Sequence, residues 1–437
     1  MGVGGRARLG GMTSIRSAGP PEAVADLVEP GTNLIVPLAN GEPVAVMDAV
    51  EALAEAGALR GVRVHQMHAM HDREYFDGRY GDELRLISYF LSHITRPRFH
   101  DGTVELVPCN FSEVPALLAR LERPLVLAAC SMPDRHGYVS LGTNSDYVAP
   151  FIGKMPFFVE ANAQMPRTMG RNSIHLSQVE GWCEVDQPLV EVPTAVPDAL
   201  DQRIADLVAE RIPDRACVQA GIGSIPNGIL TALSGHRDLG IHTELLSDGV
   251  VDLVEQGVVT GVHKVRRPGK VVGTFALGTR RLYDFLDVNP AVELLPVDWV
   301  NDPRVIAQER NFVSINATLQ VDFLGQAASE TIGGQYWSGS GGQADFARGA
   351  MYSEGGQGFL VLPSTAAHGQ VSRIVPRLPE GSAVTTIKNT VDKVVTEHGV
   401  AELRGRSIRE RTNALVAIAD PAFRDHLESQ ARLLGWW

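Results

Sequence analysis

The chain has 437 residues and a formal net charge of −12, with 44% hydrophobic and 21% charged residues, which is the composition of an ordinary soluble globular protein. Its length suggests two or three domains. The acidic balance argues against nucleic-acid and membrane-surface partners, because both require clustered lysine and arginine. No apolar run approaches the roughly 18 residues of a membrane span.

Cysteine usage and the N-terminus bear on the compartment. The four cysteines, Cys109, Cys130, Cys183 and Cys217, show no CxxC spacing, so neither a zinc site nor a disulfide framework is indicated. We therefore expect a reducing, cytoplasmic location. Residues 1–11 carry basic side chains without an apolar core, which does not fit a secretory signal. We expect them to form a disordered tail before a second possible start at Met12.

The first half alternates apolar runs with helical periodicity. Short apolar runs predict strands at residues 34–38, 62–64, 104–107, 125–129 and 157–159. Helical spacing predicts helices over residues 46–56 and 114–121. This alternation predicts an α/β fold whose mostly parallel sheet has helices on both faces.

A change in composition marks the predicted domain boundary. Residues 186–197 are rich in Val, Glu and Pro and have no period, which favours a crossover between domains at 12–190 and 198–437. After it, Leu200, Ile204, Leu207, Val208 and Ile212 share one helical face.

The stretch 216–249 predicts a strand, a tight loop, a helix and a second strand. Cys217-Val218 enters the turn Gly221-Ile222-Gly223, and Pro226 lies in the first turn of the helix, where its missing N–H is tolerated. A second strand follows at 239–241. In open α/β sheets, ligands bind at the carboxyl ends of strands. The glycine-rich loop and Glu244 both fall there, so Glu244 is a candidate nucleophile or base.

The remainder continues the α/β pattern. Apolar runs predict strands at residues 271–275, 292–295, 312–315 and 359–362. Helices are expected at 250–254 and 281–286. A capping box, Ser407 to Glu410, opens what we expect to be the last helix, running through Ile418.

Ordered sequence motifs carry a resemblance to a known family. In the second half they are GIGSIPN (221–227), HTELLSDG (242–249), FALG (275–278), PVDWVNDP (296–303), SINATLQVD (314–322), SGSGGQADFARGA (338–350), SRIVP (372–376) and VTEHGVAELRG (395–405). Weaker matches in the first half are SMPDRHGYVSLGTNSD (131–146) and EANAQMPRTMG (160–170). The chain resembles the acetyl-CoA hydrolase/transferase family, most closely its short branch, the 4-hydroxybutyrate CoA-transferases.

The resemblance implies a fold and a reaction. It implies two similar open α/β domains of the CoA-transferase type, with the active site in the cleft between them. The implied reaction moves coenzyme A between a short acyl-CoA (4-hydroxybutyryl-, butyryl- or acetyl-CoA) and a carboxylate such as acetate. It further implies a homodimer or larger assembly, with no metal and no permanently bound cofactor, because coenzyme A is a substrate.

Glu244 is the implied nucleophile. In the family, the glutamate of the HTE motif attacks the thioester, and a covalent glutamyl-CoA thioester forms. A carboxylate suits this step, because its reference pKa of about 4.3 leaves it ionised at neutral pH without a base. An isolated glutamate at this place would more often be a polar cap at a strand end.

Two glycine-rich loops are candidates for binding coenzyme A and for stabilising an oxyanion with backbone N–H groups. The first comprises Gly221, Ile222, Gly223, Ser224 and Ile225, and the second contains Gly339, Gly341 and Gly342. Gly342 and Asn316 are assigned to the catalytic set, and Asn316 would offer a side-chain amide to the reacting carbonyl. Simple tight turns are the alternative. A nicotinamide site is disfavoured, because Pro226 occupies the last glycine position of GxGxxG.

Other residues have weaker expected roles. We expect Phe346 to pack, Asp345 to fix its loop by accepting backbone N–H groups, and His242 to orient the end of the strand. The basic run 264–270 would contact CoA phosphates or, more simply, form a solvated hairpin. His65, His68 and His71 could share a helical face and bind a metal ion. A metal site is disfavoured, because they lack a carboxylate or cysteine partner at ligand spacing.

The wall that receives the acyl group is expected in the first half. The candidates are Asn40-Gly41, His136-Gly137-Tyr138 and Met165-Pro166-Arg167, with Arg167 either pairing a substrate carboxylate or forming a structural ion pair. The alternatives for the whole chain are an acyl-CoA hydrolase using the same glutamate, a sugar-phosphate isomerase, and a non-catalytic acyl-CoA-binding protein.

Overall fold

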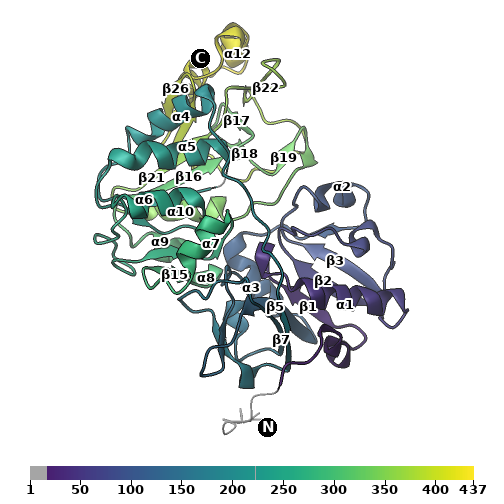
Figure 1. Ribbon diagram of the computed structural model, residues 1–437. Helices are drawn as coiled ribbons and strands as arrows, with labels where there is room; N and C mark the ends of the chain where they lie inside the picture. Colours follow the sequence, from purple (N-terminus) through teal and green to yellow (C-terminus); the bar gives the residue numbers. More distant parts are fainter. Residues whose placement is uncertain (1–16, 222) are drawn as a thin grey trace, which may run out of the picture.

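Two α/β halves, each built on a largely parallel sheet, make up the protein in the computed structural model (Figure 1). Residues 17–221 and 223–437 are described, so the predicted N-terminal tail, Met12 and Ile222 lie outside the described residues. In this part of the chain, no helix combines the length and the apolar character needed to cross a membrane.

The first half contains a seven-stranded parallel sheet of order β4-β3-β2-β1-β5-β7-β9. Its strands are β1 (Asn33–Val36), β2 (Val62–Gln66), β3 (Leu84–Ser88), β4 (Glu105–Leu106), β5 (Pro124–Ser131), β7 (Phe157–Asn162) and β9 (Gly181–Val185). Its helices are α1 (Val44–Glu55), α2 (Thr95–His100) and α3 (Val114–Leu118). The predicted strands are confirmed, whereas β3 and β9 were not predicted and α3 ends earlier than expected.

Both faces of this sheet are buried, as the predicted helix-covered parallel sheet requires. On β1, Leu34 and Val36 belong to one apolar core, and Ile35 belongs to the other. Successive strand side chains point to opposite faces, so two separate cores are filled by one continuous apolar run.

The second half contains a six-stranded sheet of order β11-β10-β16-β21-β25-β26, in which only the β25–β26 pair is antiparallel. The strands are β10 (Cys217–Ala220), β11 (Gly240–Ile241), β16 (Phe312–Ala317), β21 (Gln357–Val361), β25 (Lys393–Thr396) and β26 (Gly399–Glu402). The longer helices are α4 (Ala199–Ala209), α5 (Ser224–Ala232), α6 (Asp248–Glu255), α7 (Arg280–Leu286), α10 (Gln343–Tyr352), α11 (Ile408–Ala417) and α12 (Pro421–Leu433). The predicted strand–loop–helix–strand unit is confirmed, since β10 and β11 are parallel neighbours.

Two expectations for the second half were wrong. The predicted strand 271–275 is divided at Thr274 into β13 (Val271–Gly273) and β14 (Phe275–Ala276), which pair with β15 (Val292–Leu294) and β12 (Leu245–Leu246). The capping box at Ser407 is present, but α11 is not the last helix. The side chain of Asp420 caps α12, whose first residue is Pro421, a start signal that the sequence contained.

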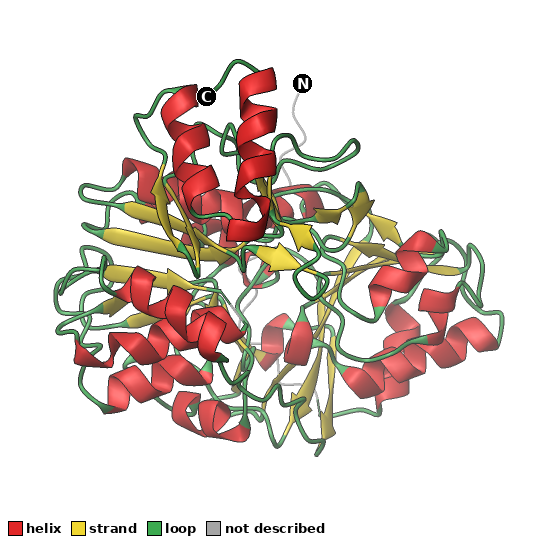
Figure 2. Ribbon diagram, turned by 90° about the horizontal axis from the view of Figure 1, so that it is seen from above, coloured by secondary structure: helices red, strands yellow, loops and turns green. Residues whose placement is uncertain are grey.

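The two halves interlock beside the nucleophile candidate. The N–H groups of Ser145 and Asp146 both donate to the carbonyl of Thr274, and Ala276 N–H donates to the carbonyl of Thr143. Phe275 also packs into a core made mostly of first-half side chains. Figure 2 shows the helices surrounding the two groups of strands. The limits 12–190 and 198–437 stay a prediction; the connecting residues 186–198 form neither helix nor strand.

Candidate active site between the halves

A cavity of about 290 Å³ lies where the carboxyl ends of the two sheets meet. From the second half it receives Gln219 and Ala220 at the end of β10, and Asn316 and Ala317 at the end of β16. This is the position at which open α/β sheets bind ligands. The full lining set is Leu38, Met67, His68, Phe90, Phe111, Gln219–Gly221, Glu244, Leu245, Phe275, Leu277, Asn316, Ala317, Ser329, Ser338–Gln343 and Phe346.

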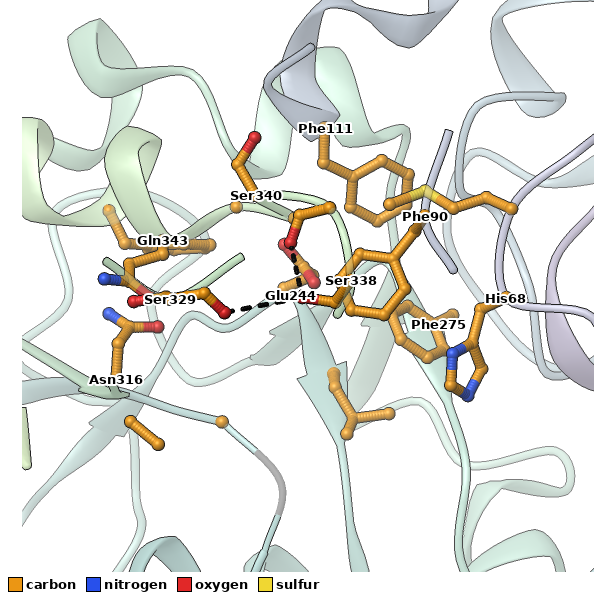
Figure 3. Close-up of a pocket in the computed structure, with 18 of the residues that line it drawn as sticks. His68, Phe90, Phe111, Glu244, Phe275, Asn316, Ser329, Ser338, Ser340 and Gln343 are labelled. Carbon is orange, nitrogen blue, oxygen red and sulfur yellow. Dashed lines mark hydrogen bonds between the residues drawn. The ribbon is translucent and has the colours of Figure 1, made fainter. Parts of the chain in front are cut away.

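Glu244 extends into this cavity from the short link between β11 and β12 (Figure 3). Its backbone is fixed, because its carbonyl accepts the N–H groups of Thr274 at 3.0 Å and Phe275 at 3.2 Å. Its carboxylate accepts a hydrogen bond from Asn301 Nδ2 at 2.7 Å and another from the backbone N–H of Gly342. The carboxyl is therefore held in one position by two donors.

Burial raises the pKa of Glu244 to about 7. The nearby carboxyl of Asp345 adds to the rise, and the hydrogen bonds from Asn301 and Gly342 oppose it. Burial disfavours the charged form of an acid. The expectation that this carboxyl has an ordinary pKa and is ionised at neutral pH without help is therefore corrected.

The loop 338–342 contains glycines where the chain passes closest to other groups. A Cβ on Gly342 would lie 2.0 Å from Glu244 Oε2 and 2.3 Å from Asn301 Nδ2. A Cβ on Gly339 would lie 2.8 Å from the carbonyl oxygen of Tyr89 in the first half. A side chain at position 339 would therefore meet backbone, and one at position 342 would displace the Glu244 carboxyl and the Asn301 amide.

This loop is held by the first half. Ser340 Oγ donates to the carbonyl of Cys109 at 2.9 Å, and Phe111 N–H donates to the carbonyl of Gly341 at 3.0 Å. The segment 109–111 therefore positions the backbone next to Glu244.

Asp345 extends this contact between the halves. Its carboxylate accepts the backbone N–H of Ser112 at 3.2 Å and the Ser112 hydroxyl at 2.9 Å. We expected Asp345 to fix its own loop by accepting backbone N–H groups, whereas the backbone N–H that it accepts belongs to Ser112 of the other half. Burial raises the pKa of Asp345 to about 7.

His242 and Phe346 are packing residues beneath the site. His242 is fully buried, its Nε2 lies 2.7 Å from the carbonyl of Val300, and its ring stacks on Trp299. Burial lowers the pKa of His242 to about 3, so the ring is neutral and Nε2 donates to that carbonyl. Phe346 is buried, as expected, and its ring also lines the cavity.

The two predicted coenzyme-binding loops occupy different parts of the site. Gly221, Asn316, Gly339, Gly341 and Gly342 line the main cavity. The amide of Asn316 is held by Ser314 Oγ at 2.9 Å and by Gln219 at 3.3 Å. Gly223, Ser224 and Ile225 line a neighbouring cavity of about 340 Å³. Both cavities are bordered by Ala317 and Ser329.

The prediction of which residues form the acyl wall was wrong, because none of the predicted residues lines the main cavity. The Asn40 side chain bonds Val190 and Tyr283 instead. His136 and Tyr138 are exposed, and Arg167 donates to the carbonyls of Met132 and Tyr138, which is a structural role.

The first-half wall is formed by Leu38, Met67, His68, Phe90 and Phe111. Leu38 lies two positions after β1. Met67 and His68 lie one and two positions after β2, and Phe90 lies two positions after β3. The sequence signal that could have identified these four residues is their position just after a buried parallel strand. Asn301 was also missed, although it lies inside the PVDWVNDP motif.

The histidine and lysine candidates separate in the structure. His65 lies on β2 and bonds Tyr89 and Asn33, so a shared helical face with His68 and His71 is wrong. Among residues 17–221 and 223–437, no group of three or more His, Cys, Asp or Glu is placed to hold a metal ion. The run 264–270 does not line the cavity, and Lys264 is buried rather than solvated, donating to the carbonyls of Ile241 and Lys270.

Comparison with known proteins places these features in one family. Residues 17–206 match the acetyl-CoA hydrolase/transferase N-terminal domain, and residues 278–431 match the C-terminal domain of the same family. The chain is 44% identical to the succinyl-CoA:cyclohexane-1-carboxylate CoA transferase of Geobacter metallireducens, over 94% of each chain. It is 41% identical to the 4-hydroxybutyrate coenzyme A transferase of Clostridium kluyveri, over 94% of this chain and 96% of that protein.

Solved structures agree with this placement. The crystal structure of RipA from Yersinia pestis superposes with a TM-score of 0.90 at 37% identity, covering 96% of this chain and 98% of that one. The crystal structure of a 4-hydroxybutyrate CoA-transferase from Porphyromonas gingivalis superposes with a TM-score of 0.78 at 37% identity, covering 95% of this chain and 96% of that one, so the CoA-transferase type of two-domain α/β fold is confirmed. The relatives from Geobacter metallireducens and Clostridium kluyveri are both named as CoA transferases, and the match extends over nearly their whole length. The protein is therefore an enzyme that belongs to the acetyl-CoA hydrolase/transferase family.

Proposed function

We propose that the protein transfers coenzyme A between a short acyl-CoA and a free carboxylate, with Glu244 as the nucleophile. The observation that carries the proposal is the carboxyl of Glu244, which lies in the cavity between the halves and is held by Asn301 and Gly342. Its elevated pKa gives a basic, weakly solvated carboxylate once the proton is lost, and such a group is a better nucleophile than a solvated one.

The proposed exchange proceeds by bond changes that balance. A carboxylate oxygen of Glu244 attacks the thioester carbon, the C–S bond breaks, and an acyl-glutamyl anhydride and the CoA thiolate result. The thiolate then attacks the glutamyl carbonyl and expels the original acyl group as a carboxylate. The acceptor carboxylate reverses these steps on the glutamyl-CoA thioester. Each barrier is lower than that of the direct exchange.

Backbone and side-chain amides would stabilise the tetrahedral intermediates. Gly341, Gly342 and Asn316 line the cavity around Glu244, and fixed donors there act without reorganisation. The neighbouring cavity beside Gly223–Ile225 shares Ala317 and Ser329 with the main one. We assign the pantetheine arm to this passage, which gives the glycine loop 221–225 its coenzyme-binding role.

The resemblance supplies the finer parts of this proposal. These are 4-hydroxybutyryl-, butyryl- or acetyl-CoA as donor, acetate as partner, a cytoplasmic location and a homodimer or larger assembly. Coenzyme A enters as a substrate, and no resident cofactor is assigned.

Acceptor dependence tests the reaction class. Butyryl-CoA is incubated with the protein at several acetate concentrations, and acetyl-CoA and free coenzyme A are measured. Transfer predicts acetyl-CoA formation with parallel double-reciprocal lines, because the first product leaves before acetate binds. Release of free coenzyme A at the same rate without acetate would instead show a hydrolase.

A further inference from the structure

The main cavity has two chemically different ends, and Glu244 lies between them (Figure 3). One end carries the polar side chains of Asn316, Ser329 and Gln343, all from the second half. The other end carries Phe90, Phe111 and Phe275, together with His68. The polar end borders the neighbouring cavity through Ser329, so the coenzyme arm belongs there and the acyl chain belongs to the aromatic end.

The aromatic end contains no positive charge. Among the described residues that line the cavity, Glu244 and His68 are the ionisable ones, and none is lysine or arginine. Burial, together with the smaller effect of the neighbouring His93, lowers the pKa of His68 to about 4, so its imidazole is neutral at pH 7. The ring of His68 packs edge-on against Phe90, with ring centroids 5.8 Å apart.

From this arrangement we propose that the acyl pocket selects uncharged acyl groups over acyl groups with a second carboxylate. This inference rests on the proposed transferase function. A distal carboxylate would be desolvated among aromatic rings, without a cationic partner and near the negative charge of Glu244. A hydrocarbon tail would be stabilised there, and a distal hydroxyl could exchange a hydrogen bond with the neutral imidazole of His68.

The same selection applies to the acceptor. In the proposed exchange, the incoming carboxylate attacks the glutamyl-CoA thioester from the space that the departing acyl group has left. Its chain therefore lies against the same aromatic end, and monocarboxylates are the expected acceptors.

Three four-carbon donors that differ only at the distal carbon test the inference. Butyryl-CoA, 4-hydroxybutyryl-CoA and succinyl-CoA are compared by kcat/KM with acetate as the acceptor. We expect the two uncharged donors to exceed succinyl-CoA by about 100-fold, because the unpaired charge is costly to bury. A preference of less than tenfold over succinyl-CoA would overturn the inference while leaving the transferase function intact. No transfer from any donor would reject both.

A pair of variants at one position isolates the charge. His68→Arg places a guanidinium at the aromatic end, and His68→Gln is its uncharged control. Both replace a residue at the same positive φ of 50°, so they share any backbone strain. We expect the ratio of succinyl- to butyryl-CoA activity to rise at least tenfold in His68→Arg and to stay at the wild-type value in His68→Gln. An equal rise in both variants would contradict the charge argument, and the wild-type donor series decides the case if His68→Arg does not fold.

Discussion

The two walls of the cavity divide the work of the site. The second-half wall offers a carboxyl, amides and glycine backbone, whereas the first-half wall offers mainly apolar side chains. The second-half wall is also fixed in place, because Ser340 and Gly341 are bonded to first-half residues. In this account, one half performs the chemistry, and the other selects the acyl group and fixes the catalytic loop.

The largest effect is expected at the second-half wall. Glu244→Ala removes the proposed nucleophile, so we expect transfer to fall by about 10³-fold or more while the protein stays folded. The assay is acetyl-CoA formation from butyryl-CoA and acetate, with circular dichroism to monitor folding. The exposed Glu354 forms a surface ion pair with Arg310, and Glu354→Ala is the matched control. Comparable activity in the two variants would show that the chemistry lies elsewhere.

Gly342→Ala perturbs the same wall without replacing Glu244 or Asn301. The added methyl group would meet Glu244 and Asn301 at distances that no packed Cβ tolerates, so the carboxyl must move. We expect kcat/KM to fall by about 100-fold, as for the loss of a fixed backbone donor. Gly235→Ala is the control, because open space surrounds that position. Equal activity in both variants would contradict the close approach.

The pH profile tests how Asn301 tunes the nucleophile. In the proposed mechanism, deprotonated Glu244 is the reactive form, and its pKa is raised to about 7, so kcat/KM should rise with pH through about 7. The hydrogen bond from Asn301 stabilises the charged form. Asn301→Ala should therefore move this rise to higher pH and lower the rate at pH 7 by about tenfold. A profile with an unshifted midpoint would exclude this role.

The smallest effect is expected at the contact between the walls. Ser112→Ala removes the hydroxyl that donates to Asp345 and leaves the backbone bond in place. A single hydrogen bond of this kind contributes about 1 kcal/mol, so we expect a few-fold loss in kcat and a slightly lower Tm. Ser112→Thr keeps the hydroxyl and should retain more activity. If both variants match the wild type, the first half does not position the loop through Ser112.

The lining of the second-half wall could be predicted from sequence because its residues lie in local motifs. Glu244 and the glycines of loop 338–342 fall within continuous motifs, and the β10–α5–β11 order places the first loop at a sheet edge. Asn301 was missed because its bond to Glu244 joins positions 57 residues apart and depends on tertiary packing.

The first-half wall could not be found in the same way. Leu38, Met67 and Phe90 are apolar residues among many others, and only the parallel order β3-β2-β1 brings them together. Asn40 and Arg167 were proposed for this wall because polar residues at strand ends attract attention. Asn40 instead bonds the segment that connects the halves, and Arg167 bonds two backbone carbonyls. The pKa of Glu244 was misjudged for a related reason, since burial is a property of the folded chain and not of the residue type.

The covalent adduct is the most direct test of the central claim. The protein is incubated with butyryl-CoA in the absence of an acceptor, digested, and analysed by peptide mass spectrometry. The account predicts coenzyme A in thioester linkage on the peptide that contains Glu244, and loss of this adduct when acetate is added. Full exchange activity with an unmodified Glu244 peptide, or with an adduct on another residue, would contradict it.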